Sequence, residues 1–143
     1  MEIQATEMVN MLKRLLESLA RTFDFKLIVL FGSAARGRLR SDSDIDIGIV
    51  TESPLFEDPD LYRDFRAALE PIENDLRRRI DCVEINSHNI VLLSQILKEG
   101  ILLHESSPQC YKVQRLHWRF LVEDNKKYTM NYSKVLERKL QAL

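Results

Sequence analysis

The chain has 143 residues, which is long enough for one domain with a hydrophobic core and too short for two. Its hydrophobic content of 45% and charged content of 30% are ordinary for a globular protein, and its formal net charge of -1 argues against a dedicated duplex-DNA binder. No apolar run approaches the ~20 residues that span a bilayer, and Cys82 and Cys110 have no metal-ligand spacing. We therefore expect a cytoplasmic protein with no membrane segment and two free thiols.

The first part of the chain alternates helical and extended patterns. Apolar residues at three- and four-residue spacing predict an amphipathic helix over residues 3–22. Runs rich in Ile, Val and Leu predict strands over 26–31 and 45–50, joined by a Gly-Ser turn and a polar loop over 38–42. Because so little chain separates these strands, we expect them to pair antiparallel.

The middle of the chain repeats this alternation. A second apolar stripe predicts a helix over 60–79, in which Pro71 implies a kink or a break. A third strand is predicted over 80–85. We expect Ser87 to cap the next helix and Gly100 to end it in the left-handed conformation.

The C-terminal part continues with a short edge strand over 101–104 and then one long or two shorter helices. Residues 111–143 carry eight Lys or Arg against three Asp or Glu, so this segment has a charge of +5. Its aromatic residues alternate with basic ones, a pattern compatible with stacking on single-stranded bases. We favour an amphipathic helix whose aromatic face packs on the domain or on a partner. The expected organisation is an α/β layered domain over 1–107, extended by a helical segment over 108–143.

Two aspartates in the second predicted strand are candidates for chemistry. Successive side chains of a strand alternate between its faces, so Asp44 and Asp46 point to the same side, with α-carbons roughly 6.5–7 Å apart. Ile45 and Ile47 then face the core. Two carboxylates so close repel each other unless a cation lies between them. A hard divalent cation that prefers oxygen ligands, with Mg²⁺ as the first candidate, is expected to bind between them.

The Gly-Ser turn ahead of these aspartates is a candidate phosphate site. Gly32 permits backbone angles closed to other residues and lets the chain approach a ligand closely. Ser33 offers a hydroxyl and a backbone N–H at an expected helix start, where phosphate binds well.

These residues together carry a family resemblance. Gly32-Ser33, ten intervening residues and Asp44-Ile45-Asp46 resemble the signature of the DNA polymerase β-like nucleotidyltransferase superfamily. The fuller strings, FGSAARG from Phe31 and SDIDI from Ser43, are similar to the minimal nucleotidyltransferases, the MNT proteins of HEPN/MNT toxin–antitoxin pairs. The resemblance implies an α+β fold with a small mixed sheet, flanking helices and a C-terminal helical segment.

The same resemblance implies a metal site. Asp44 and Asp46 would bind two Mg²⁺ ions that bridge a triphosphate. A third carboxylate on a neighbouring strand completes the family's site. Asp81, in the string Ile80-Asp81-Cys82-Val83, is our candidate as metal ligand and proton acceptor, with Glu84 as its rival. The sequence leaves open whether the side of the strand that carries Asp81 meets the metals.

The implied nucleotide-binding residues are Gly32, Ser33, Arg36 and Arg40. Arg36 lies inside the family string, whereas Arg40 lies in the following loop, where a guanidinium can neutralise phosphate oxygens. A solvated basic loop is a nearly equal explanation for Arg40.

The function that the resemblance implies is transfer of AMP from ATP to a hydroxyl on a partner HEPN toxin, and we expect this hydroxyl to belong to a tyrosine. Pyrophosphate is released and the chain acts as the antitoxin. One alternative is a nucleotidyltransferase for small molecules such as aminoglycosides, although those enzymes usually carry a larger second domain. A second alternative is a catalytically silent binding module that neutralises its partner by contact.

Overall fold

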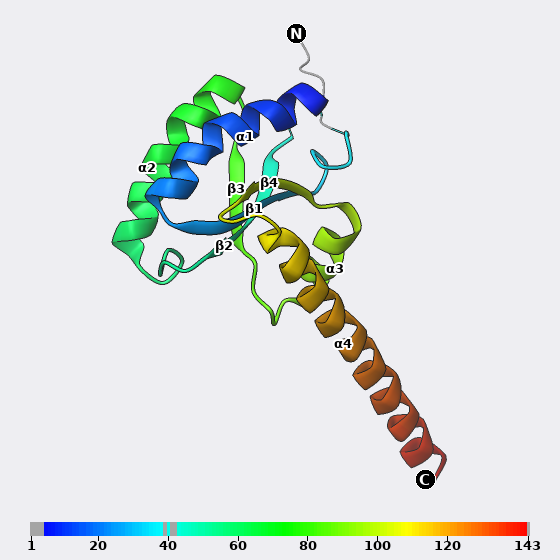
Figure 1. Cartoon of the computed structure of the whole chain (residues 1–143). Helices are drawn as coiled ribbons and strands as arrows, with labels where there is room; N and C mark the ends of the chain where they lie inside the picture. The colour runs from blue at the N-terminus through cyan, green and yellow to red at the C-terminus, as the bar shows by residue number, and fades with distance from the viewer. Residues whose placement is uncertain (1–4, 39, 41–42, 143) are drawn as a thin grey trace.

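A mixed sheet of four strands, in the order β3-β2-β1-β4, is the centre of the fold. The structure is a computed structural model that describes residues 5–38, 40 and 43–142. Strand β2 pairs antiparallel with β1, as predicted, and parallel with β3, while β4 pairs antiparallel with β1. In chain order the elements are α1 (Ala5–Thr22), β1 (Phe25–Phe31), β2 (Ile45–Thr51), α2 (Pro59–Leu76), β3 (Ile80–Glu84), α3 (Ile90–Glu99), β4 (Ile101–Glu105) and α4 (Cys110–Gln141) (Figure 1).

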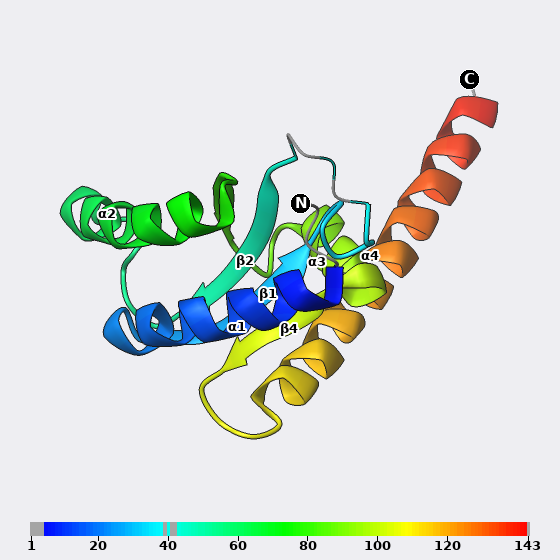
Figure 2. The ribbon, with the colours of Figure 1, turned by 90° about the horizontal axis from the view of Figure 1, so that it is seen from above.

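Helices cover both faces of the sheet, so the domain has two cores. Side chains of α1 and α2 pack on the face that carries Ile28 and Leu30 of β1. Side chains of α3 and the first half of α4 pack on the opposite face, which carries Leu27 and Val29. Figure 2 shows α1 and α2 separated from α4 by the strands. The near-continuous apolar run of β1 follows from this arrangement, because both of its faces are buried.

Helix α2 has a clear start and passes through its internal proline. The Asp58 side chain accepts hydrogen bonds from the N–H groups of Asp60 and Leu61, and Pro59 occupies the first turn. Of the predicted kink or break at Pro71, the break is wrong, since α2 is continuous from Pro59 to Leu76. Pro71 lies on the exposed side of the helix. Proline has no N–H to donate to the carbonyl oxygen one turn earlier, and water can donate to that oxygen instead.

The ends of α3 also differ from the prediction. The cap is Asn89, whose side chain accepts from the Leu92 N–H, so the expected cap at Ser87 is wrong. Gly100 is extended (φ −64°, ψ 140°) rather than left-handed, because the chain enters β4 at the next residue. A Cβ at Gly100 would lie 2.6 Å from the Ile96 carbonyl oxygen and 2.9 Å from Val29 Cγ1. Glycine at this position therefore permits close packing of α3 on β1.

The C-terminal segment is a single helix, α4, which leaves the domain partway along its length (Figure 1). Tyr111, Trp118 and Val122 are buried in the second core. Every residue from Glu123 to Ala142 is exposed. Within the described parts of the chain, no helix combines the length and apolarity needed to cross a bilayer. Both cysteines are free thiols, as expected.

Candidate functional site

The Gly32–Ser33 turn lies at the end of β1 and is held by three backbone hydrogen bonds. The N–H groups of Arg36, Gly37 and Arg38 donate to the carbonyl oxygens of Gly32, Ala34 and Ser33 at 3.2, 3.2 and 2.9 Å. Residues 33–37 form turns and not a helix, so the expected helix start at Ser33 is wrong. Phosphate binding here would use the N–H groups and the hydroxyl of a tight turn, without a helix dipole.

Gly32 brings this turn against the second strand. It has a φ of +76°, a conformation that side chains strongly disfavour, and a Cβ built on it would collide with Asp46 Oδ2. Phe31, the preceding residue, is paired with Asp46 across the β1–β2 ladder. The structure thus places the Gly-Ser turn and the second aspartate in direct contact, although 13 residues separate them in sequence.

Asp46 and Asp81 are neighbours across the parallel β2–β3 pair. Their α-carbons are partners in the register, so both side chains leave the sheet on the same face. Ile45 and Ile47 are fully buried on the opposite face, as predicted. Asp44 directly precedes β2 and is exposed.

Asp46 is a partly buried carboxylate with two acidic neighbours, Asp81 and Asp44. Partial burial is the largest cause that raises the pKa of Asp46 above its ordinary value, and the charges of Asp81 and Asp44 raise it further. The guanidinium of Arg36 opposes these effects in part. A divalent cation among the three carboxylates would offset this charge repulsion and favour the ionised form of Asp46.

The structure separates the two candidates for the third carboxylate. Ile80 and Cys82 contribute to the α1/α2 side of the sheet, and by strand alternation Glu84 leaves β3 on that same side. Asp81 leaves it on the side of Asp46. The arrangement favours Asp81. Cys82 is an unsuitable nucleophile, because burial is the main cause that raises the pKa of its thiol to about 12.

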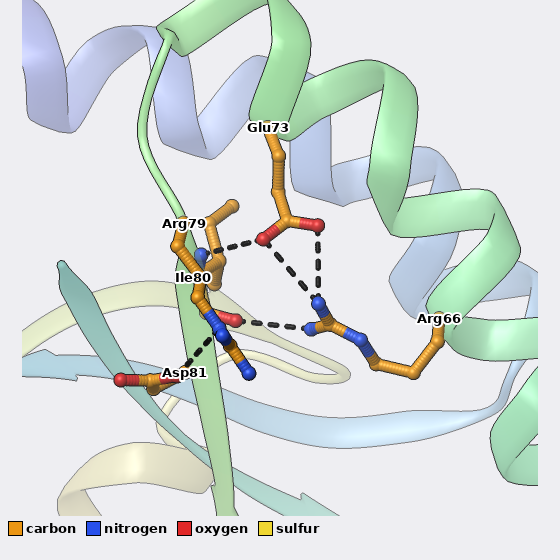
Figure 3. Close-up of polar contacts among 5 residues, drawn as sticks. All are labelled: Arg66, Glu73, Arg79, Ile80 and Asp81. Carbon is orange, nitrogen blue, oxygen red and sulfur yellow. Dashed lines mark hydrogen bonds and ion pairs between the residues drawn. The ribbon is translucent and has the colours of Figure 1, made fainter.

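The carboxylates of the three aspartates are suitable ligands for a hard cation, but their side chains do not converge on one point. Among residues 5–38, 40 and 43–142, no three His, Cys, Asp or Glu side chains converge closely enough to hold a metal ion. Asp81 is instead turned toward Arg79, whose Nε lies 3.5 Å from Asp81 Oδ1 (Figure 3). With 44% of its side chain exposed, Asp81 is free to change rotamer. Metal binding therefore requires a side-chain adjustment on a backbone that already has the correct register.

A residue that the sequence reasoning missed, Glu99, engages the Gly-Ser turn. Its carboxylate accepts from the Gly32 N–H at 3.2 Å, from Arg36 Nη1 at 2.9 and 3.1 Å, and from Gln95 Nε2 at 2.8 Å. Burial acts against ionisation, but the hydrogen bonds from Gln95, Arg36 and Gly32 prevail and hold the pKa of Glu99 below its ordinary value. Glu99 is the last residue of α3, and no sequence motif connects it to a turn 67 residues earlier.

Arg40, the other predicted phosphate ligand, belongs to a different set of contacts. Its N–H donates to Ser43 Oγ at 3.1 Å, and its carbonyl oxygen accepts from Arg78 Nη1. The same Arg78 nitrogen donates to the Ser43 carbonyl at 3.0 Å. Arg78, also missed from sequence, thus ties the loop before Asp44 to the end of α2. Residues 39, 41 and 42 of this predicted loop lie outside the described residues.

An open hollow of about 790 Å³ lies along α2 and the segment that follows it, and is lined by five arginines, among them Arg77 and Arg78. None of the seven predicted site residues lines it. Three of its arginines are committed to acidic partners within the chain, for example Arg63 to Asp60 at 3.0 Å. The carboxylates and the Gly-Ser turn therefore remain the candidate site.

The chain is similar in sequence to known nucleotidyltransferases. Residues 13–109 match the model of the family described as polymerase beta, nucleotidyltransferase. The chain is 33% identical over 82 residues to the putative protein adenylyltransferase MJ1215 of Methanocaldococcus jannaschii, an alignment that covers 57% of this chain and 90% of the relative.

Solved structures share the fold at low sequence identity. One, a toxin–antitoxin with AMP-PNP, superposes with a TM-score of 0.63 at 20% identity and covers 90% of this chain and 98% of its own. Another, from a complex of a tri-AMPylated Shewanella oneidensis HEPN toxin with its MNT antitoxin, has a TM-score of 0.58 at 18% identity and covers 92% and 98%. At this identity the likeness establishes the fold.

Proposed function

The chain belongs to the polymerase β nucleotidyltransferase family, and we propose that it transfers AMP from ATP to a tyrosine hydroxyl of a HEPN toxin, for which it is the antitoxin. The observation that carries this proposal is the register of Asp46 beside Asp81, with the Gly32–Ser33 turn in contact with Asp46. This combination offers ligands for cations next to donors for phosphate. The reaction belongs in the cytoplasm, where ATP is available and free thiols persist.

The residues have separate roles in this proposal. Asp44, Asp46 and Asp81 would hold two Mg²⁺ ions, which when bound supply charge neutralisation of the triphosphate and acidify the attacking hydroxyl. Ser33 would hold phosphate oxygens through its backbone N–H and its hydroxyl, and Gly32, whose own N–H donates to Glu99, lets the turn approach them closely.

The proposed step is a displacement at the α-phosphorus of ATP. The acceptor oxygen forms a bond to the α-phosphorus of ATP, and the bond between the α-phosphorus and the bridging oxygen breaks. Pyrophosphate leaves with that electron pair. Asp81, which lies on the edge strand with 44% of its side chain exposed, accepts the proton of the hydroxyl.

The two arginines differ in the support they have. Arg36 lies at the Gly-Ser turn with 44% of its side chain exposed, so it can reach a bound phosphate while it contacts Glu99. Arg40 is exposed, and its described contacts hold the loop before Asp44. We therefore assign Arg40 a secondary role, as a positive charge at the entrance for the nucleotide.

The distal half of α4 is the surface that we assign to the partner. Its exposed apolar side chains include Tyr128, Met130, Tyr132, Leu136 and Leu140. Aromatic and aliphatic anchors of this kind dominate the energetics of protein interfaces. The +5 charge of residues 111–143 suits a partner face that is acidic. The structural similarity to antitoxin chains from HEPN complexes supports this assignment.

Intact-mass spectrometry tests the proposal. The purified chain is incubated with ATP, Mg²⁺ and a HEPN protein encoded beside it, and the partner should gain one or more AMP units. Asp44→Asn and Asp46→Asn variants, shown to be folded by circular dichroism, should give no gain. A partner that is bound and inhibited without any mass gain would instead identify a silent binding module.

A further inference from the structure

Two side chains of α2 form hydrogen bonds with the backbone of Ile80, the first residue of β3. Glu73 Oε2 accepts from the Ile80 N–H at 2.8 Å, and Arg66 Nη1 donates to the Ile80 carbonyl oxygen at 3.0 Å. The two side chains are also paired with each other, because Arg66 Nη2 donates to Glu73 at 3.1 and 3.3 Å. Figure 3 shows this closed ring of contacts beside Asp81.

This ring occupies the open edge of the sheet. Strand β3 lies at the edge in the strand order, and its odd-numbered residues pair with β2: the Ile45 N–H donates to the Arg79 carbonyl, and the Ile85 N–H donates to the Ile49 carbonyl. The peptide groups of Ile80 therefore point away from β2. Arg66 and Glu73 supply the donor and the acceptor that a fifth strand would otherwise provide.

Both side chains are sheltered, which makes the contact more than a surface ion pair. The side chain of Glu73 is 15% exposed and that of Arg66 is 30% exposed, whereas the Arg63–Asp60 pair on the same helix is 76% and 85% exposed. Charge-assisted hydrogen bonds are about twice as strong as neutral ones and fix geometry as well. The ring thus fixes the start of β3 relative to α2.

The position of Asp81 depends on that start. Asp81 follows Ile80 directly, and a slip of one residue in an edge strand would move every side chain to the opposite face. Asp81 would then leave the side of Asp46, and Cys82 would replace it. The parallel register that puts the two aspartates side by side is short, since β3 has only five residues.

We propose that Arg66 and Glu73 are positioning residues that hold the backbone of Asp81 in register with Asp46, on the face from which its carboxylate can turn to a metal. This inference rests on the proposed function in one respect, that Asp81 is a metal ligand. Neither residue is among the proposed ligands of the metal or of the nucleotide. Loss of an outer contact that orients a metal ligand typically costs 10–100-fold in metal affinity.

The test uses the full-length chain and direct Mn²⁺ binding, measured by electron paramagnetic resonance in the presence of a non-hydrolysable ATP analogue. Arg66→Lys keeps the charge and loses the forked geometry, and Glu73→Ala removes the acceptor. Each should weaken Mn²⁺ binding about tenfold or more. Glu73→Gln retains an acceptor oxygen for the Ile80 N–H and should fall between Glu73→Ala and the wild type.

The matched control is Arg63→Gln, which breaks the exposed ion pair on the same helix and should leave Mn²⁺ affinity unchanged. Amide hydrogen exchange, followed by NMR, should accelerate at Ile80 in the Glu73→Ala variant and not in the control. All measurements are made well below each variant's melting temperature, so that a lower folded fraction does not imitate weaker binding.

The proposal is overturned if folded Arg66→Lys and Glu73→Ala bind Mn²⁺ as the wild type does. If those two variants do not fold, Glu73→Gln decides, because wild-type affinity in that variant would make the ring purely structural. A wild type that binds Mn²⁺ but never transfers AMP would defeat the proposed reaction and leave the positioning role intact. A wild type that binds no Mn²⁺ would defeat both.

Discussion

Arg36 Nη1 lies 2.9 Å from Glu99 Oε2, so the basic side chain nearest the Gly-Ser turn is already paired with a carboxylate. A triphosphate at this turn would add a second anion that competes for the same guanidinium. Glu99 stays ionised at neutral pH because its pKa is held low. The pair therefore sets how much of the Arg36 charge is available to a nucleotide.

The first prediction separates a direct role of Arg36 from a compensating one. Arg36→Gln should weaken binding of the Mg²⁺-bound ATP analogue about tenfold or more, as expected for a lost charge-assisted hydrogen bond. Glu99→Gln should tighten it severalfold, since it removes a competing anion. Titration calorimetry on both single variants and the double variant gives the coupling between them. If the double variant binds as tightly as the wild type, Arg36 only neutralises Glu99 and does not contact phosphate.

The second prediction concerns the glycine in contact with Asp46. Gly32→Val should weaken nucleotide binding more than Ser33→Ala does, because it forces the turn away from Asp46. Ser33→Ala removes one hydrogen bond, worth about 1.5–3 kcal/mol when the acceptor is a charged phosphate.

Gly37→Ala is the matched control for this effect. Gly37 has a φ of +70°, close to the +76° of Gly32, but nothing lies within 4 Å of a Cβ added there. Gly37→Ala and Gly32→Ala should thus share a backbone cost of about 1–2 kcal/mol. Only Gly32→Ala should change nucleotide affinity. If the two variants bind the nucleotide with equal affinity, the phosphates are not bound at this turn.

The third prediction follows from the raised pKa of Asp46. A carboxylate whose pKa is higher in the folded than in the unfolded state destabilises the fold at neutral pH, where it is ionised in both. Asp46→Asn should therefore raise the melting temperature at pH 7 by a few degrees. The gain should shrink as pH falls through the raised pKa and vanish below the unfolded value of about 3.8. Thermal melts from pH 3 to 8, with the exposed Asp64→Asn as control, measure this. A variant less stable than the wild type at pH 7 would contradict it.

Metal binding should titrate with the same group. Mn²⁺ needs ionised Asp46, so its affinity should fall as pH decreases toward a midpoint above 3.8, and Mn²⁺ should displace the proton there. An affinity independent of pH between 4 and 7 would indicate that Asp46 is not a ligand.

The fourth prediction concerns the partner surface on α4. Truncation at residue 111 would remove Tyr111, Trp118 and Val122 from the second core, so it cannot separate folding from binding. Truncation after Asp124 spares that core. The shortened chain should keep its melting temperature within a few degrees and should lose the complex with the HEPN partner, measured by size-exclusion chromatography. A complex of wild-type affinity would place the interface elsewhere.

Much of the fold follows from local patterns in the sequence. The strand pairing of β1 with β2 was predictable, because a short connection leaves few alternatives to an antiparallel pair. The ends of α3 could not be predicted in this way. Ser87 and Asn89 are both suitable capping residues and lie two positions apart, and Gly100 is required for packing against Val29 and not for a left-handed turn. Ser33 was expected to start a helix, but the chain closes a tight turn there instead.

The candidate site divides in the same way. Asp44 and Asp46 stand out in the sequence because only Ile45 separates them, and in the structure Asp44 directly precedes β2 while Asp46 lies within it. The choice between Asp81 and Glu84 depended on the register between two strands, which is a long-range property. Glu99, Arg66 and Glu73 act through contacts with backbone groups of distant elements, and such contacts leave no local pattern.

The free half of α4 has a thermodynamic consequence. Residues 123–141 form about five helical turns, about 28 Å long, and every one of these residues is exposed. A solitary helix of this length is only marginally stable in water, so its amides should exchange rapidly in the free protein while those of β1 stay protected. Docking on a partner would then order the backbone of this segment and bury its exposed apolar side chains at the same time. Association should accordingly show a large negative heat-capacity change and an unfavourable ordering entropy, so that part of the binding free energy is spent on folding.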